Sequence, residues 1–138
     1  MGQKVDFDAL LKPTASTTGF SEYSVSKLCQ VISTAYLAKK LAGTKITVFA
    51  LHPGVVMTDI WRQVPVCIRC CFPCCMLNTK DGAVTSLYCC LSDQVLDKSG
   101  LYFDKCEVAA PNPLVNDEQL QLELWNRSLK WCNMEDPF

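Results

Sequence analysis

Tyr23 and Lys27 stand four residues apart and are the pair of side chains in this sequence with the clearest chemical potential. On a helix, side chains at this spacing project from one face, about one turn apart. A neighbouring cation favours phenolate over phenol, so we expect Lys27 to lower the pKa of Tyr23 from its ordinary value of about 10. A tyrosine tuned in this way acts as a general acid or base on a carbonyl/alcohol pair near neutral pH. By itself the spacing is weak evidence, because such pairs arise by chance on many surface helices.

The helix that would carry this pair is predicted from about Glu22 to Leu41. Lys39 and Lys40 occupy its last turn, and Gly43 follows at the position where a left-handed C-cap is favoured. The polar stretch 14–21 before it is rich in Ser, Thr and Gly and offers several N-caps. The apolar residues that recur at helical spacing are Leu28, Val31, Ile32, Ala35, Leu37, Ala38 and Leu41.

The segments that follow alternate strand and helix. The run 46–51 is nearly continuous in apolar and β-branched residues, which is typical of a buried parallel strand, and His52-Pro53-Gly54 ends it. A two-stranded parallel sheet is marginal in water, and parallel sheets are normally covered on both faces, so we interpret the chain as the C-terminal part of a larger α/β domain. The remaining predicted segments are a helix over 81–91, a strand over 100–103, a proline-bearing linker over 111–113, and a final helix capped by Asn116 or Asp117 that carries Leu120, Leu124, Trp125, Leu129 and Trp131.

Composition indicates a globular protein and excludes several function classes. The 138 residues suffice for one domain at most, and 49 % are hydrophobic while 20 % are charged. The formal net charge of -1 offers no basic excess for nucleic acid. No stretch reaches the roughly 18 uncharged apolar residues of a membrane-spanning helix, and the charged stretch 1–11 is unlike a secretory signal. The ten cysteines are therefore expected to be free thiols in a reducing compartment, with adjacent pairs such as Cys89–Cys90 poorly placed to bond each other.

Five motifs follow one another along the chain: Tyr23-Ser24-Val25-Ser26-Lys27-Leu28, His52-Pro53-Gly54-Val55-Val56-Met57-Thr58, the stretch 81–89, the stretch 99–106, and the tail from Asp117 to Trp125. Together they resemble a short-chain dehydrogenase/reductase, and more narrowly the retinol dehydrogenase group of that superfamily. The resemblance covers about Gly2 to Trp131. It implies an α/β fold in which this chain is the C-terminal part of a doubly wound, Rossmann-type parallel sheet, with the N-terminal dinucleotide-binding half absent.

The resemblance implies a catalytic pair and an activity. Tyr23 would be the proton donor or acceptor at the substrate oxygen, and Lys27 would hydrogen-bond the nicotinamide ribose while lowering the pKa of Tyr23. The implied enzyme is an NAD(P)-dependent oxidoreductase acting on a lipophilic alcohol or carbonyl such as retinol or retinal. NADP is the expected cofactor, with NAD as the alternative, and no metal is expected.

Further cofactor contacts are implied at the end of the predicted strand. Pro53 and Gly54 would let the backbone lie against the nicotinamide, as glycine permits close approach. The Val56 backbone and the Thr58 hydroxyl match positions that touch the carboxamide. His52, the only histidine, is expected to be a packing residue at the strand end rather than a ligand or catalyst.

The dinucleotide-binding segment of this family's proteins has no counterpart in this sequence. The six glycines are isolated, and none forms the G-x-x-x-G-x-G run that presents a helix N-terminus to a pyrophosphate. The catalytic serine of the family would fall before Met1, and its asparagine on an earlier helix is also missing. We therefore expect a truncated form with little or no activity alone. Two other function classes stay open: a non-catalytic remnant that associates with a partner or full-length relative, and a binding module centred on the cysteine cluster.

Half of the cysteines lie between 67 and 75, in Cys67-Ile68-Arg69-Cys70-Cys71-Phe72-Pro73-Cys74-Cys75. Two C-x-x-C pairs invite a zinc site, but these overlap within nine residues instead of joining two knuckles across a spacer. By resemblance, this stretch belongs to an apolar lid over the substrate, which would suit a lipophilic ligand and peripheral membrane contact with Arg62 and Arg69 at the headgroups. Cysteines at such a surface are candidates for S-acylation, and the alternative is cysteine as a small apolar filler.

These expectations describe residues 1–138 as one partial domain. Its predicted segments are a loop over 1–21, the Tyr/Lys helix over 22–43, a strand and Pro-Gly loop over 46–58, the Cys-rich apolar lid over 59–80, and C-terminal helices with a strand over 81–138. We expect the chain in the cytoplasm or on the cytosolic face of the endoplasmic reticulum membrane. Its expected partners are a lipophilic small molecule and copies or relatives of the chain in a homo- or hetero-oligomer, but no nucleic acid.

Overall fold

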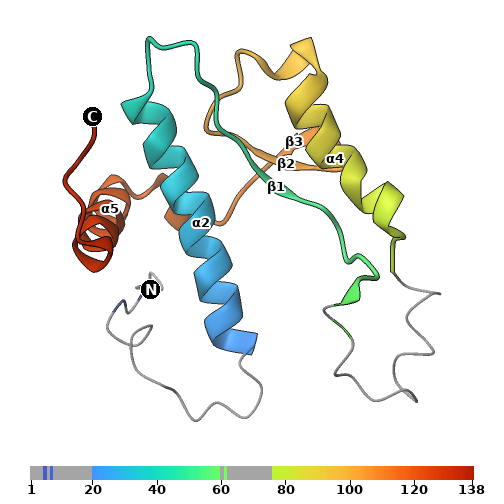
Figure 1. Ribbon diagram of the computed structural model, residues 1–138, viewed down its shortest axis with the longest axis horizontal. Helices are drawn as coiled ribbons and strands as arrows, with labels where there is room; N and C mark the ends of the chain where they lie inside the picture. The colour runs from blue at the N-terminus through green and yellow to red at the C-terminus, as the bar shows by residue number, and fades with distance from the viewer. Residues whose placement is uncertain (1–4, 6, 8–19, 60, 62–75) are drawn as a thin grey trace.

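The computed structural model describes residues 5, 7, 20–59, 61 and 76–138. Helices α2 (Phe20–Lys40) and α4 (Thr79–Leu91) flank a small sheet, and α5 (Glu118–Cys132) packs against the far side of α2 (Figure 1). Two 3-10 helices, η3 (Asp93–Val95) and η4 (Pro113–Asn116), precede β2 and α5 respectively. The described part of the chain is therefore α/β, as predicted, and none of its helices is long and apolar enough to cross a bilayer.

The described sheet has three strands in the order β1 (Ala50–His52), β2 (Tyr102–Asp104) and β3 (Glu107–Ala109). β1 runs parallel to β2, with Ala50 opposite Tyr102 and His52 opposite Asp104. This parallel pair confirms the two strands expected from the sequence. β3 runs antiparallel to β2, so the expectation of a purely parallel two-stranded sheet is corrected to a mixed one.

A two-residue turn joins β2 to β3 and explains why the third strand was not predicted. Lys105 and Cys106 both have positive φ, at 50° and 65°. Positive φ at both central residues is typical of the type I′ hairpin turn, whose twist matches that of the flanking strands. Asn-Gly and Asp-Gly are the usual signals for such a turn. Lys-Cys carries no such signal, so the hairpin is invisible in the sequence.

The first strand is shorter than predicted at its N-terminal end. β1 begins at Ala50 rather than at Ile46, and Ile46 is 57 % exposed. Contacts with the segment before β2 begin only at Val48, whose N–H donates to Ser99 Oγ (3.2 Å) and whose carbonyl accepts from Gly100 N (2.7 Å). No strand of the described sheet reaches the earlier residues, which leaves Ile46 outside the core despite its apolar side chain.

The helix ends follow local capping chemistry. Gly43 has a φ of 84°, which confirms the left-handed residue expected beyond the end of α2. The Asn78 side chain accepts a hydrogen bond from Asp81 N (2.9 Å) at the start of α4. Asp117, one of the two caps expected for the last helix, accepts from Leu120 N (3.0 Å). Each cap satisfies an N–H that the first helical turn leaves without an intrahelical partner.

The described residues form two hydrophobic clusters, one between α2 and α5 and the other between the sheet and α4. The first fills the space between α2, η4 and α5, and its buried members are Phe7, Ile32, Val115 and Leu124. The second lies between the sheet and α4, and its buried members are Cys89, Val95 and Phe103, with Phe49, Leu51 and Tyr88 packed against them. The expected linker over 111–113 lies between β3 and η4, with only its last residue, Pro113, in η4, and Val115 two residues later enters the first cluster.

The C-terminal segment folds back onto the α2–α5 pair. Lys40 Nζ lies 2.7 Å from Asp136 Oδ2, which also accepts a hydrogen bond from Trp125 Nε1 at 3.3 Å. The Trp125 ring lies between those of Tyr36 and Phe138, with centroids 5.4 Å and 6.1 Å away. These contacts tie the last turn of α2 to α5 and to the chain end.

Candidate active site

Tyr23 and Lys27 lie on the same face of α2, one turn apart. The Lys27 Nζ lies 5.7 Å from the centroid of the Tyr23 ring and donates a hydrogen bond to Gln30 Oε1 at 3.2 Å. Tyr23 is 54 % exposed, so its phenol is accessible to a ligand. The ammonium therefore lies close to both the ring of Tyr23 and the amide of Gln30. The sequence spacing had predicted the proximity of Tyr23 and Lys27.

The Pro53–Gly54 segment leaves the end of β1 directly. Gly54 has a φ of 81°, a left-handed conformation that favours glycine. A Cβ at this position would lie 2.6 Å from Leu77 Cδ1. Glycine therefore allows the sharp turn after the strand and the close approach of the Leu77 side chain.

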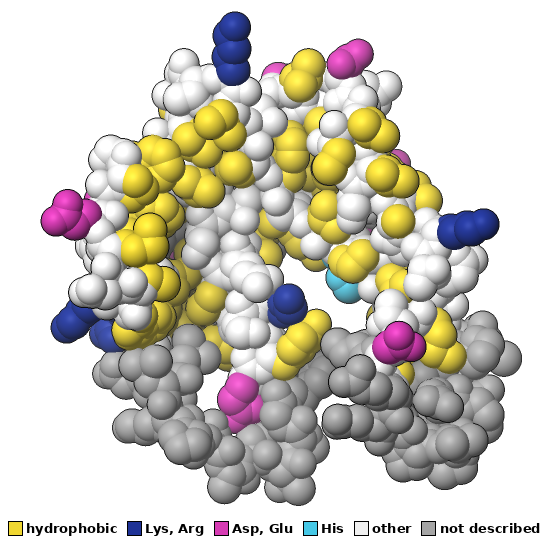
Figure 2. Space-filling view, in the orientation of Figure 1, with side chains coloured by type: hydrophobic (Ala, Val, Ile, Leu, Met, Phe, Trp, Pro, Cys, Tyr) yellow, Lys and Arg dark blue, Asp and Glu magenta, His cyan; other side chains and the backbone are white. Residues whose placement is uncertain are grey.

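These two segments form the walls of one groove. The groove has a volume of about 550 Å³ and contains four of the six predicted site residues, Tyr23, Lys27, Pro53 and Gly54. The molecular surface is hollowed between α2 and the segment that follows β1 (Figure 2). Its remaining lining residues come from α2 (Ser24, Gln30, Val31, Thr34), from β1 and the residue before it (Phe49, Ala50, Leu51, His52), and from β2 (Tyr102).

Val56 and Thr58 do not line this groove. Val56 pairs with Leu77 in an isolated parallel bridge, and its carbonyl accepts a hydrogen bond from Trp61 Nε1 at 2.9 Å. Its side chain lies against α4, since a Cβ on Gly82 would come within 2.4 Å of Val56 Cγ2. Thr58 is exposed, and its carbonyl accepts from Trp61 N at 3.3 Å. The carboxamide contacts assigned to these two residues remain predictions.

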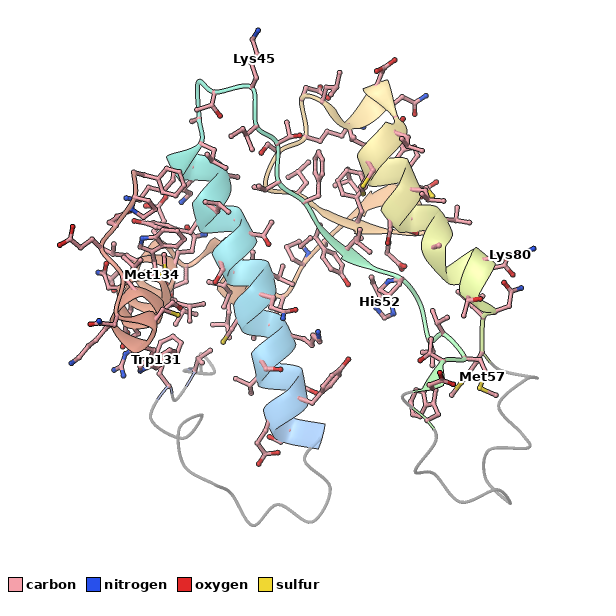
Figure 3. All side chains as sticks on the ribbon, viewed as in Figure 1. Lys45, His52, Met57, Lys80, Trp131 and Met134 are labelled. Atoms are coloured by element: carbon pink, nitrogen blue, oxygen red, sulfur yellow. The ribbon has the colours of Figure 1, made fainter. Side chains whose placement is uncertain are left out.

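His52 is exposed rather than packed, which corrects the expectation of a packing residue at the strand end. Its side chain extends from the end of β1 toward the space between α2 and the following segment (Figure 3). It lines both the groove with Tyr23 and a second groove of about 460 Å³ that also contains Thr85 and Cys106. Among the residues that the structure describes, no three His, Cys, Asp or Glu side chains are grouped to hold a metal ion.

Comparison with known proteins identifies the family. The chain is 35 % identical to retinol dehydrogenase 12 of Homo sapiens over 127 residues, which are 91 % of this chain and 40 % of that protein. It is 31 % identical to retinol dehydrogenase 13 of Homo sapiens over 141 residues, covering 96 % of this chain and 43 % of the relative. It is 34 % identical to dehydrogenase/reductase SDR family member 13 of Bos taurus over 137 residues, covering 95 % and 36 %. The chain is related to the short-chain dehydrogenases/reductases of the retinol dehydrogenase group.

The match lies in the C-terminal part of these relatives. The chain spans about two fifths of the length of the curated relatives it matches. No protein-family model and no solved structure matches the chain. Its relatives are named as dehydrogenases, so at the level of the family this chain is related to oxidoreductases.

The chemistry of the groove's side chains is compatible with the nicotinamide end of a dinucleotide. Lys27 would hold the ribose, Tyr23 would face the substrate oxygen, and the turn at Pro53 and Gly54 would allow the backbone to lie against a flat ring. None of the described helices begins with a Gly-rich loop; α4 begins with Asn78 and α5 with Asp117 as caps. In a short-chain dehydrogenase/reductase that loop would receive the pyrophosphate.

Sequence reasoning missed Gln30 and Tyr102. Gln30 had a signal, because Tyr23, Lys27, Gln30 and Thr34 recur at helical spacing and so share a face. Tyr102 had none, since its place in the groove depends on the register that sets it opposite Ala50. Burial and the nearby Asp104 carboxylate raise the pKa of Tyr102, so its phenol stays protonated at neutral pH.

The cysteine cluster at 67–75 and most of the expected lid lie outside the described residues. Five cysteines are described, and all of them are free thiols: Cys29, Cys89, Cys90, Cys106 and Cys132. Burial raises the pKa of the Cys29 and Cys89 thiols. These two therefore stay protonated at neutral pH and behave as small apolar core residues.

Proposed function

We propose that this chain supplies the proton-transferring half of a short-chain dehydrogenase/reductase active site. Its reaction is the NAD(P)-dependent interconversion of a lipophilic alcohol and its carbonyl, with retinol and retinal as the model pair and NADP as the cofactor. The observation that carries the proposal is the grouping of Tyr23, Lys27, Pro53 and Gly54 around one groove. The relationship to retinol dehydrogenases supplies the reaction class.

In this site Tyr23 exchanges a proton with the substrate oxygen. Lys27, whose Nζ lies 5.7 Å from the centroid of the Tyr23 ring, fixes the ribose through its ammonium hydrogens. Gln30 restrains that ammonium through its hydrogen bond. The dinucleotide, when bound, supplies or accepts the hydride at the carbon that bears the oxygen.

The free edge of β1 offers the means to complete the site. Ala50 N donates to Leu101 O at 3.2 Å, so the backbone groups of Ala50 and His52 face β2. Because a parallel strand bonds its two neighbours through alternate residues, those of Phe49 and Leu51 face the other edge. Within the described sheet this edge belongs to no strand pair. We propose that a parallel strand from the N-terminal part of a family member pairs here and brings the Gly-rich loop with it.

The second candidate function is a non-catalytic association module, and the same exposed edge favours it. An unpaired strand edge is a ready template for another chain. Under this reading the chain would bind a full-length relative through β1 without contributing Tyr23 to turnover. The two functions differ in whether the resulting assembly depends on the Tyr23 hydroxyl.

A complementation assay separates them. The purified chain is assayed for NADPH-dependent reduction of retinal, first alone and then with the separately expressed N-terminal part of retinol dehydrogenase 12. We expect negligible turnover alone and turnover in the mixture. Tyr23→Phe should abolish that turnover, whereas Tyr36→Phe, on the α5-facing side of the same helix, should leave it intact. Binding without turnover would favour the association module, and turnover that survives Tyr23→Phe would exclude Tyr23 as the catalyst.

Peripheral membrane contact is proposed for the Cys-rich lid, on the cytosolic face of the endoplasmic reticulum. Its sequence combines an apolar stretch with two arginines and five cysteines. Acyl-biotin exchange on the wild-type chain and on a variant with Cys67, Cys70, Cys71, Cys74 and Cys75 changed to Ser tests for acylation. A signal unaffected by these changes would remove the lid as the anchor.

A further inference from the structure

Tyr102 places a second phenol in the groove that contains Tyr23. It is the register partner of Ala50, so both side chains lie on the same face of the sheet, the face toward α2. The neighbouring pair, Leu51 and Phe103, faces α4 and packs in the second core cluster. Because Ala50 is small, the floor of the groove stays open beside the Tyr102 ring.

Four polar side chains recur along the α2 wall of the groove, beside the apolar Val31. Tyr23, Lys27, Gln30 and Thr34 line the groove from successive turns of α2. A helix that packs on a sheet normally buries an apolar stripe against it. On this face of α2, Lys27 Nζ donates to Gln30 Oε1 at 3.2 Å, and Thr34 Oγ1 donates to the Gln30 backbone carbonyl at 2.9 Å. These side chains give the groove hydrogen-bonding groups beyond the catalytic pair.

We propose that Tyr102 is a ligand-contacting residue of this groove and donates a hydrogen bond to a hydroxyl-bearing part of the ligand, namely the sugar of the dinucleotide that Lys27 also binds. The inference deepens the proposed function and rests on it. A neutral phenol is a good donor to a sugar hydroxyl, and the partial burial of Tyr102 keeps it in that form. No sequence motif or relationship described above assigns a role to this residue.

The four tyrosines of the chain allow a direct test. With 3-fluorotyrosine incorporated, each tyrosine gives its own ¹⁹F signal. NADP⁺ is titrated into the full chain up to the millimolar range, where the weak binding expected of this chain alone becomes measurable. Tyr36 stacks on Trp125 at 5.4 Å and Tyr88 donates to Gln94 Oε1 at 3.1 Å, both outside the groove. We expect the signals of Tyr23 and Tyr102 to shift together while those of Tyr36 and Tyr88 stay in place.

Phenylalanine variants supply the energetic test. Tyr102→Phe removes only the hydroxyl, and the Tyr23 signal then reports the remaining affinity. Loss of one neutral hydrogen bond should weaken NADP⁺ binding about two- to tenfold. Tyr88→Phe is the matched control and should leave the affinity unchanged.

The outcomes distinguish this inference from the proposed function. A shift of Tyr23 without one of Tyr102, or unchanged affinity in Tyr102→Phe, would overturn the role of Tyr102 and leave the proposed function standing. If no tyrosine signal responds to NADP⁺, the groove does not bind the cofactor, and both proposals fall together.

Discussion

Two glycines with nearly the same backbone conformation provide a test of how α2 packs on the sheet. Gly43 and Gly100 have φ values of 84° and 83°. A Cβ at Gly43 would meet nothing within 4 Å, whereas a Cβ at Gly100 would lie 2.8 Å from the Cβ of Ala38 on α2. Alanine at either site suffers the same left-handed strain of about 1–2 kcal/mol. Only Gly100→Ala adds a steric conflict, which overpacking data put at about 1–3 kcal/mol.

The expected difference in the free energy of unfolding between Gly100→Ala and Gly43→Ala is therefore the cost of the steric conflict alone. In urea unfolding followed by circular dichroism, Gly100→Ala should lose about 1–3 kcal/mol more than Gly43→Ala. With a denaturant slope near 2 kcal/mol/M, that is a further shift of about 0.5–1.5 M in the midpoint. The entropy that alanine removes from the unfolded chain is common to both variants and cancels.

A double-mutant cycle with Ala38→Gly assigns the conflict to its partner. Ala38→Gly alone should destabilise by about 0.5–1 kcal/mol, because glycine weakens a helix interior. Combined with Gly100→Ala it should recover most of the steric cost, giving a coupling of about 1–3 kcal/mol. The packing described here would be refuted if Gly100→Ala were no more destabilising than Gly43→Ala, or if the cycle showed no coupling.

Three further predictions concern the helix cap, the core and the C-terminal contact. Asp117→Ala should destabilise by about 0.5–2 kcal/mol in urea unfolding, since Leu120 N loses its capping acceptor; Gln119→Ala, at an exposed position in the same helical turn, is the control. Phe103→Ala removes a ring that is 0 % exposed and should cost about 3–5 kcal/mol, whereas its half-exposed register partner Val108 should tolerate Ala within about 0.5 kcal/mol. The hydrogen bond from Lys40 lowers the pKa of Asp136 and raises that of Lys40, so this contact stabilises the fold between their ordinary pKa values, and its contribution falls as pH drops through the lowered pKa of Asp136 or rises through the raised pKa of Lys40. Asp136→Asn should therefore differ from wild type in urea midpoint near neutral pH, and the two should converge only as pH falls below the ordinary pKa of Asp and through the lowered pKa of Asp136. A gap that persists once Asp136 is protonated would contradict this.

Local signals in the sequence predicted the helices well. The helical spacing of apolar residues predicted α2, and Gly43 predicted where it ends. Asp117, as an N-cap residue, predicted the start of α5. The pairing of Tyr23 with Lys27 also followed from spacing alone, because two residues on one helix need no tertiary information to meet. Prediction was weaker for the strands, whose limits depend on partners far along the chain. Ile46 looked like a strand residue but has no partner strand, and the hairpin at Lys105–Cys106 uses residues that give no turn signal.

The candidate site likewise contains residues that local sequence features predict and residues that depend on contacts far along the chain. The turn at Pro53 and Gly54 was predictable because the end of a strand is a local feature, and Gly54 does adopt positive φ. Their place in the candidate site came from the family resemblance, because a Pro-Gly turn alone is ordinary. Tyr102 enters the groove only through its register with Ala50, which no local pattern encodes. His52 was expected to pack and is instead exposed, since the strand ends where the groove opens.

We propose that this chain contains the Tyr23–Lys27 half of an oxidoreductase site but not the half that binds the dinucleotide phosphates. Calorimetric titration of NADPH into the purified 138-residue chain is the direct test. We expect weak binding, with no saturation in the submillimolar range, and a clear gain in affinity when the N-terminal part of a retinol dehydrogenase is added. Submillimolar affinity of the chain alone would show that it binds the dinucleotide without the N-terminal part.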